Sequence, residues 1–119
     1  MTINILDIYQ EFYNYNNKLI PALEQVVEHL QQQAEDQALS LFIHCLEGIQ
    51  WSLDVMILSR PYQKDMSFDL DTQKVQDILD GLTESLENQD YILMADILEY
   101  ELIPLLKQFH AETEKMIEE

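Results

Sequence analysis

Apolar side chains recur every three or four residues along four stretches of the chain, which is the spacing of one face of an α-helix. The first stretch predicts a single helix over residues 4–33. Its predicted inward positions are Ile5, Tyr9, Phe12, Leu19, Leu23, Val26 and Leu30, with Asn16 as the one polar interruption. Pro21 lies inside this stretch and removes one backbone hydrogen bond. Because the apolar phase is the same on both sides of Pro21, we expect one long helix, bent near residues 16–21.

Three further helices are predicted, over residues 36–59, 71–87 and 90–116. Their expected inward positions are Leu39, Phe42, Leu46, Ile49, Leu53 and Met56; then Val75, Leu79, Leu82 and Leu86; then Tyr91, Ala95, Leu98, Leu102, Leu105 and Phe109. The connections between these helices are short, except for residues 60–70. The sequence therefore predicts an all-α, antiparallel, up-down-up-down four-helix bundle with long first and last helices, forming one domain over residues 1–119.

The ends of the predicted helices carry residues that cap or break helices. Short polar side chains that favour the N-cap are Thr2 or Asn4, Asp36, and Asp71 or Thr72. Arg60–Pro61 ends the second helix, because the residue before a proline disfavours the helical conformation. In the connection that follows, we expect Tyr62, Met66 and Phe68 to fold back over one end of the bundle.

The composition agrees with this fold and narrows the classes of partner. The chain has 119 residues, of which 47% are hydrophobic and only two are glycine and three proline. Its formal net charge of −17 argues against binding to nucleic acid or to an anionic membrane surface. The single cysteine, Cys45, cannot form an internal disulfide, and no apolar run approaches the ~20 residues of a membrane span. We expect a cytoplasmic protein.

Two helices carry a second apolar stripe that a simple amphipathic helix lacks. On the second helix this stripe consists of His44, Gly48, Trp51, Val55 and Leu58, and on the last helix of Ile92, Leu93, Ile97, Tyr100 and Ile103. Either the chain covers these stripes itself, through the first helix or residues 60–70, or another protein covers them. The second interpretation predicts a homodimer whose contact residues are His44, Trp51, Val55, Leu58, Tyr100 and Ile103.

Catalytic and metal-binding patterns are not found in the sequence. Asp96 and Glu99 share a helix face, but Glu101 points elsewhere, and no histidine follows a glutamate by three residues as in di-metal bundles. We therefore expect no enzyme activity, no catalytic residue, no metal and no cofactor. A metal- or small-ligand-binding bundle that uses Asp96, Glu99 and Tyr100 is the alternative from a different class.

Three stretches resemble a family of small acidic helical proteins of Gram-positive Bacillota. They are NNKLIPALEQVVEHL, LEGIQWSLDVMIL and ADILEYELIPLLKQF. Their motifs are Leu-Ile-Pro at residues 19–21, Glu-Gly-x-x-Trp at 47–51 and Leu-Glu-Tyr-Glu-Leu at 98–102, although Ala22 stands where the family pattern has glycine. That family is uncharacterised, so the resemblance implies a bundle fold and transfers no active site.

In size, charge and expected fold, the chain also resembles flagellar export chaperones. Those proteins bind an amphipathic helix of a secreted subunit in a groove between their own helices. The expectation from the residues themselves is a non-catalytic protein that acts by protein–protein contact, most simply as a homodimer. The looser resemblance implies an alternative, a chaperone or adaptor for a helical, basic export substrate.

Overall fold

The computed structural model describes residues 4–65 and 70–118, and throughout these residues the regular structure is helical, with no strand. The elements are α1 (Ile5–Gln31), α2 (Glu35–Leu58), the 3₁₀ helix η1 (Arg60–Asp65), α3 (Thr72–Glu87), and a last helix made of α4 (Tyr91–Ile97), the π-helical turn η2 (Leu98–Leu102) and α5 (Ile103–Glu118). The prediction of an all-α chain with four helices is confirmed. Met66 and Phe68, which were expected to fold back over the bundle, lie outside the described residues.

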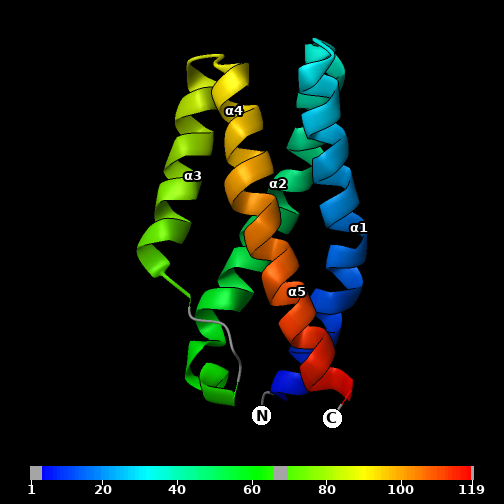
Figure 1. Cartoon of the computed structure of the whole chain (residues 1–119), viewed down its shortest axis with the longest axis vertical. Coiled ribbons are helices and arrows are strands. Elements are labelled where there is room, and N and C mark those ends of the chain that lie inside the picture. Colours follow the sequence, from blue (N-terminus) through cyan, green and yellow to red (C-terminus); the bar gives the residue numbers. More distant parts are fainter. Residues whose placement is uncertain (1–3, 66–69, 119) are drawn as a thin grey trace.

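The helices lie along the long axis of a molecule that measures 44 × 27 × 25 Å. Figure 1 shows the direction of the chain reversing at each connection, with both ends of the chain at the same end of the molecule. α1 packs mainly against α2 and α5, whereas the main packing partner of α3 is α4. The molecule therefore consists of an α1–α2–α5 core with an α3–α4 pair beside it.

Helix capping follows the sequence at two of three predicted sites. Asn4 accepts a hydrogen bond from the backbone at the start of α1 (3.0 Å), and Asp71 accepts two at the start of α3 (3.0 and 3.3 Å). The prediction for Asp36 is wrong, because α2 begins at Glu35 after Ala34. Asp36 instead lies in the first turn, where a carboxylate is favourable beside the positive end of the helix dipole.

The two Leu-Ile-Pro motifs adopt different backbone conformations. Pro21 lies inside a continuous α1, as predicted. Pro104 directly follows a π-helical turn, in which the Ile103 N–H donates to the Leu98 carbonyl five residues before it. The wider turn gives room for a proline ring that would otherwise meet the Tyr100 carbonyl. The prediction of one regular last helix is therefore wrong at this turn.

The core is centred on aromatic rings of α1 and α5. The Phe12 and Phe109 rings meet edge to face with centroids 4.8 Å apart, and Tyr9 meets Phe109 at 6.2 Å. Asn16, the polar interruption of the first apolar stripe, is fully buried here. Its Nδ2 donates to the Phe12 carbonyl and to the Ser52 hydroxyl of α2, both at 3.1 Å. The pair fixes the register of α1 against α2 because a buried amide without a partner is costly.

Most of the predicted inward positions are buried, and three of the exceptions lie where α2 faces α3. Leu46 was expected in the core but is 41% exposed, and Leu79 and Leu86 are only half-buried. Leu39, Ile5 and Tyr91 are also half-buried. Ile78, which was not expected inward, is buried instead. These differences on α2 and α3 arise because α3 leans on α4, so the sides of α2 and α3 that face each other stay partly open.

α2 is long and apolar enough, by length and composition, to cross a membrane, with a mean hydropathy of 1.3 over its most apolar 18 residues. This differs from the expectation that no stretch of the chain comes near that length. The signal is weak evidence, since core helices of soluble proteins pass the same test, and 44% of this window is buried inside the molecule. Buried positions such as Phe42, Ile49 and Ser52 give α2 the pattern of a core helix.

Candidate functional site

The middle of the second stripe on α2 is covered by α1. The Trp51 ring stacks on Phe12, with centroids 6.3 Å apart and planes at 26°, and lies 5.7 Å from the Tyr15 ring. Trp51 is half-buried and Val55 is buried. Of the two interpretations of this stripe, coverage by the first helix therefore holds for its centre. Trp51 is partly a core residue, and its loss would affect folding as well as any contact.

Gly48 gives α1 and α2 their close approach. The Tyr15 side chain lies directly over Gly48, and a methyl group at Gly48 would overlap the Tyr15 hydroxyl and lie 2.6 Å from its Cζ. This glycine was predicted to allow the close approach of a partner. The residue that makes the approach is Tyr15 of the same chain, which the apolar pattern did not single out.

The two ends of the α2 stripe remain exposed. His44 is exposed, and its Nδ1 lies 2.7 Å from the Ser40 carbonyl oxygen, one turn earlier in the same helix. Leu58, at the C-terminal end of α2, is 75% exposed. Tyr62, which was expected to fold back on the bundle, is also largely exposed. Of the contact residues predicted on α2, His44 and Leu58 are therefore the ones that another molecule can reach freely.

Three of the predicted contact residues meet in an apolar hollow at the end of the molecule that carries η1. The hollow has a volume of about 330 Å³. It is lined by Ile5, Ile8 and Glu11 of α1, by Trp51, Val55, Leu58 and Ser59 at the end of α2, and by Tyr62 of η1. We call it the end hollow. It presents Leu58 and Tyr62 at an apolar surface whose walls come from α1, α2 and η1.

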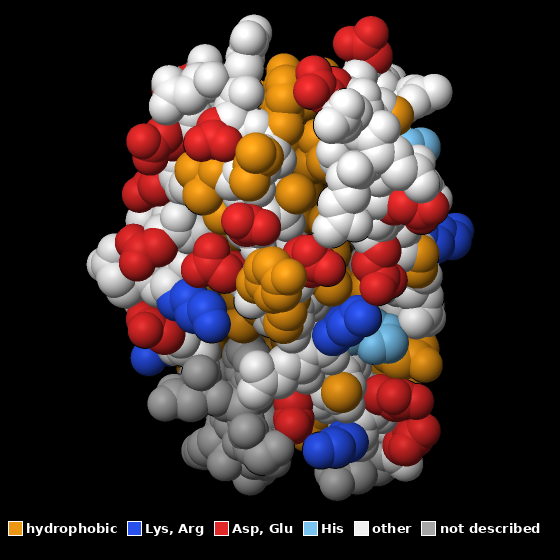
Figure 2. Space-filling view, turned by 45° about the horizontal axis from the view of Figure 1, so that its top comes forward, with side chains coloured by type: hydrophobic (Ala, Val, Ile, Leu, Met, Phe, Trp, Pro, Cys, Tyr) orange, Lys and Arg blue, Asp and Glu red, His pale blue; other side chains and the backbone are white. Residues whose placement is uncertain are grey.

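The stripe predicted on the last helix is divided between core and surface. Ile103 is buried, whereas Tyr100 is 69% exposed and Ile92 is 79% exposed. Figure 2 shows acidic side chains spread over the face turned to the viewer, with apolar side chains gathered between them. Tyr100 and Ile103, which were predicted to act together, therefore do not form one contact surface.

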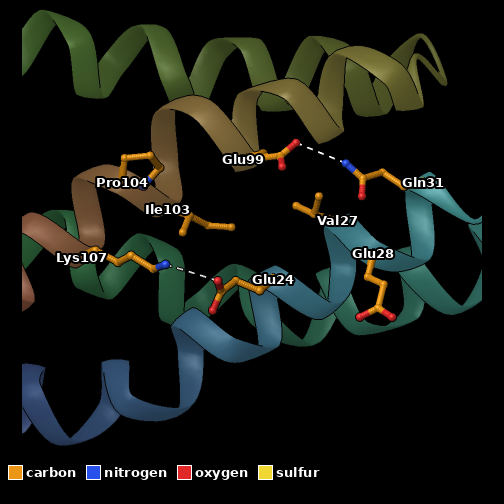
Figure 3. Close-up of a pocket in the computed structure, with 8 residues that line it drawn as sticks. All are labelled: Glu24, Val27, Glu28, Gln31, Glu99, Ile103, Pro104 and Lys107. Atoms are coloured by element: carbon orange, nitrogen blue, oxygen red, sulfur yellow. Dashed lines mark hydrogen bonds and ion pairs between the residues drawn. The ribbon is translucent and has the colours of Figure 1, made fainter.

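A polar cleft of about 430 Å³ separates α1 from the last helix beside the π-helical turn (Figure 3). Its two walls are joined by a hydrogen bond from Gln31 Nε2 to Glu99 Oε2 (3.2 Å) and an ion pair from Lys107 Nζ to Glu24 Oε2 (3.3 Å). Both members of the ion pair are about half exposed, so the pair adds little to stability. Ile103 lies at the floor of this cleft, with Val27 across from it (Figure 3).

Asp96, Glu99 and Tyr100 are not brought together as a binding site. Glu99 faces the cleft toward Gln31, while Asp96 lines a separate hollow together with Leu30 and other residues. Tyr100 lines neither of them. Within residues 4–65 and 70–118, no group of three His, Cys, Asp or Glu side chains is placed to hold a metal ion.

An apolar groove between α2 and α3 was not predicted. It has a volume of about 300 Å³ and is lined by Phe42, Leu46, Ile49 and Gln50 of α2 and by Leu79, Leu82, Thr83, Leu86 and Glu87 of α3. We call it the α2–α3 groove. Six of its lining residues were predicted as inward positions, namely Phe42, Leu46, Ile49, Leu79, Leu82 and Leu86, and nothing in the sequence indicated that the space between the two helices stays open.

Two buried titratable groups have shifted pKa values. Burial raises the pKa of the Cys45 thiol above its ordinary value, which favours the uncharged, unreactive form. Burial also raises the pKa of the Tyr9 hydroxyl, and the Ser59 side chain near it opposes part of this shift. Both groups belong to the core, and neither lines the end hollow or the α2–α3 groove.

With the fold and its surfaces described, the comparisons with known proteins give one finding. Residues 7–112 match the family described as a domain of unknown function, DUF8042, and the chain belongs to that family. This agrees with the expectation of an uncharacterised family. No curated protein and no solved structure matches the chain significantly.

Proposed function

We propose that this protein acts without catalysis, by contact with other proteins, as an antiparallel up-down-up-down four-helix bundle. The topology is supported by the short connections after α1 and α3 and by the packing of α1 on α2 and of α3 on α4. The net charge of −17 favours a protein partner over nucleic acid or an anionic membrane. The free, buried Cys45 is in keeping with a reducing, cytoplasmic location.

The observation that carries this proposal is the end hollow. Its rim is formed by Leu58, which is 75% exposed, and by Tyr62, which is largely exposed. Proteins use apolar surfaces of this kind to bind one another. At this exposure Leu58 leaves most of its apolar surface free to contact another molecule. Tyr62 offers both an apolar ring and a hydroxyl, as is common at protein interfaces.

The proposed occupant of the end hollow is a second copy of this chain. In a two-fold dimer, Leu58 of each copy would enter the hollow of the other, and the same patch would serve on both sides. The local charge does not prevent this. Glu11 is the one acidic residue among those lining the hollow, and the basic residue Arg60 directly follows Ser59, which also lines it. The total charge of two copies still opposes association, so added salt should strengthen the dimer.

The test is the solution mass, measured by light scattering over a range of protein concentrations. The wild type and Ile92→Asp are expected to be dimers, and Leu58→Asp is expected to be a monomer. Ile92 is the matched control, because it is as exposed as Leu58 but lies on another face, in α4. A monomeric wild type, or a Leu58→Asp protein that stays dimeric, would show that the end hollow is not a dimer interface.

A further inference from the structure

We propose that the α2–α3 groove binds one amphipathic α-helix of another protein, with leucine-like residues on its apolar face and lysine or arginine on its flanks. This inference rests on the proposed function, that the protein acts by protein contact, and it names the chemistry of a partner. It concerns a different surface from the end hollow, which the proposed homodimer uses.

The shape of the groove fits a helix. The groove is lined by two rows of apolar side chains at helical spacing, Phe42, Leu46 and Ile49 on α2 and Leu79, Leu82 and Leu86 on α3. Each row extends over two helical turns, about 10 Å at 1.5 Å per residue. Rows spaced by three and four residues form ridges, and the side chains of a third helix pack into the groove between such ridges.

Burial divides the groove into a fixed floor and open walls. Phe42, Ile49 and Leu82 are buried and belong to the core. Leu46 is 41% exposed and Leu86 is half-buried, so their apolar surface has no cover among the described residues that line the groove. The groove stays open because α3 packs mainly against α4 and not against α2. A helix laid along it would complete the packing of α2.

The charge around the groove selects the chemistry of that helix. α2 and α3 each carry four acidic residues, and Lys74 is the one basic residue on either helix. Glu87 lines the groove itself, and Gln50, which also lines it, donates a hydrogen bond from Nε2 to the Asp54 carboxylate (3.0 Å). Positive residues on the flanks of the bound helix would meet these carboxylates. A second copy of this chain would bring mainly negative charge and is disfavoured at this surface.

The experiment measures binding of a labelled synthetic peptide to the full chain by fluorescence anisotropy. The peptide is an amphipathic helix of about 18 residues, long enough to be helical when bound, with leucine on one face and lysine elsewhere. Two control peptides accompany it: a scrambled one with the same composition but no apolar face, and one with glutamate in place of lysine. We expect saturable binding of the first peptide and binding at least about tenfold weaker for both controls.

Two protein variants place the binding in the groove. Leu46→Glu replaces apolar surface on the α2 wall with a charged side chain that a leucine face would have to bury, and Thr83→Arg adds bulk and positive charge on the α3 side, so each should weaken binding at least about tenfold. Ile92→Glu, on a different face, is the control and should bind as the wild type does. Circular dichroism verifies that each variant is folded. If one variant fails to fold, the other still decides the outcome.

Three results would overturn the inference. The first is equal binding of the scrambled peptide, which would mean attraction by net charge alone. The second is unchanged affinity in a folded Leu46→Glu or Thr83→Arg protein. The third is conversion of a dimer to a monomer by Leu46→Glu, which would make the groove an interface between copies of this chain. Failure of the dimer at the end hollow is read separately, from the mass of Leu58→Asp.

Discussion

Replacing Gly48 by alanine tests how α1 and α2 are held together. A methyl group at Gly48 would overlap the Tyr15 hydroxyl and lie 2.6 Å from Cζ and 3.0 Å from Cε2, whereas unstrained carbon atoms stay about 3.5–4.0 Å apart. The Tyr15 ring must therefore turn away and lose its contact with Trp51. Overpacking of this kind costs about 1–3 kcal/mol, against a gain of about 1 kcal/mol in helix propensity. The two effects together give a net loss of up to about 2 kcal/mol in the free energy of unfolding.

The assay is chemical denaturation followed by circular dichroism, in a double-mutant cycle. In a Tyr15→Ala background the three nearest contacts of this methyl group are removed, so Gly48→Ala should stabilise the protein by about 1 kcal/mol. Gly81→Ala is the matched control, since its methyl group would meet only the flexible end of Ile97, at 2.8 Å, and should be neutral or stabilising. If Gly48→Ala stabilises the wild type as much as the Tyr15→Ala protein, then Tyr15 does not pack on Gly48 and the reasoning is refuted.

Three further predictions concern the core and a helix end, and all three are measured by denaturation. Ser52→Ala removes one acceptor of Asn16 Nδ2 and should lower the free energy of unfolding by about 1 kcal/mol, and an unchanged value would mean that the buried bond contributes nothing. Gln33 has a φ of 60°, so Gln33→Gly should stabilise by about 1 kcal/mol, while Gln32→Gly, at a φ of −90°, should give no gain. The raised pKa of Tyr9 means that the folded state favours the neutral hydroxyl, so its contribution is complete below its ordinary pKa of 10.0 and is lost as the pH rises above that value. Stability should therefore fall less steeply above about pH 10 in Tyr9→Phe than in the wild type, and identical slopes would exclude this assignment.

The helices could be predicted from the sequence because their signals are local. Apolar spacing located all four helices, and Asp71 capped α3 as its side chain suggested. Asp36 does not cap α2, because the N-cap lies two residues earlier, at Ala34, and the helix begins at Glu35. The preceding turn, in which Gln33 has a positive φ, decides where the helix begins. The π-helical turn was missed because Pro21 and Pro104 each end a Leu-Ile-Pro tripeptide, so the local sequence does not distinguish the two sites. The backbone is α-helical at the first site and π-helical before the second.

Which surfaces stay open could not be predicted, because this depends on contacts between helices. The apolar pattern marked Trp51 as needing a cover, but it did not identify Tyr15 and Phe12 of α1 as that cover. The helical spacing predicted inward positions for Leu46 and Leu79. It gave no information that α3 packs against α4 and leaves both residues facing a groove. Leu58 was predicted as a contact residue because it belongs to the second stripe on α2, and it is 75% exposed, whereas Val55 of the same stripe is buried.

The most direct test of protein contact as the function is methyl NMR of the labelled chain. On dilution from a dimer to a monomer, the methyl signals of Ile5, Ile8 and Leu58 in the end hollow should shift. The signals of Leu46 and Leu86 in the α2–α3 groove should stay, and these two should shift instead when the lysine–leucine peptide is added. The account would be contradicted if the signals of the end hollow did not shift on dilution and the signals of the α2–α3 groove did not shift on addition of the peptide.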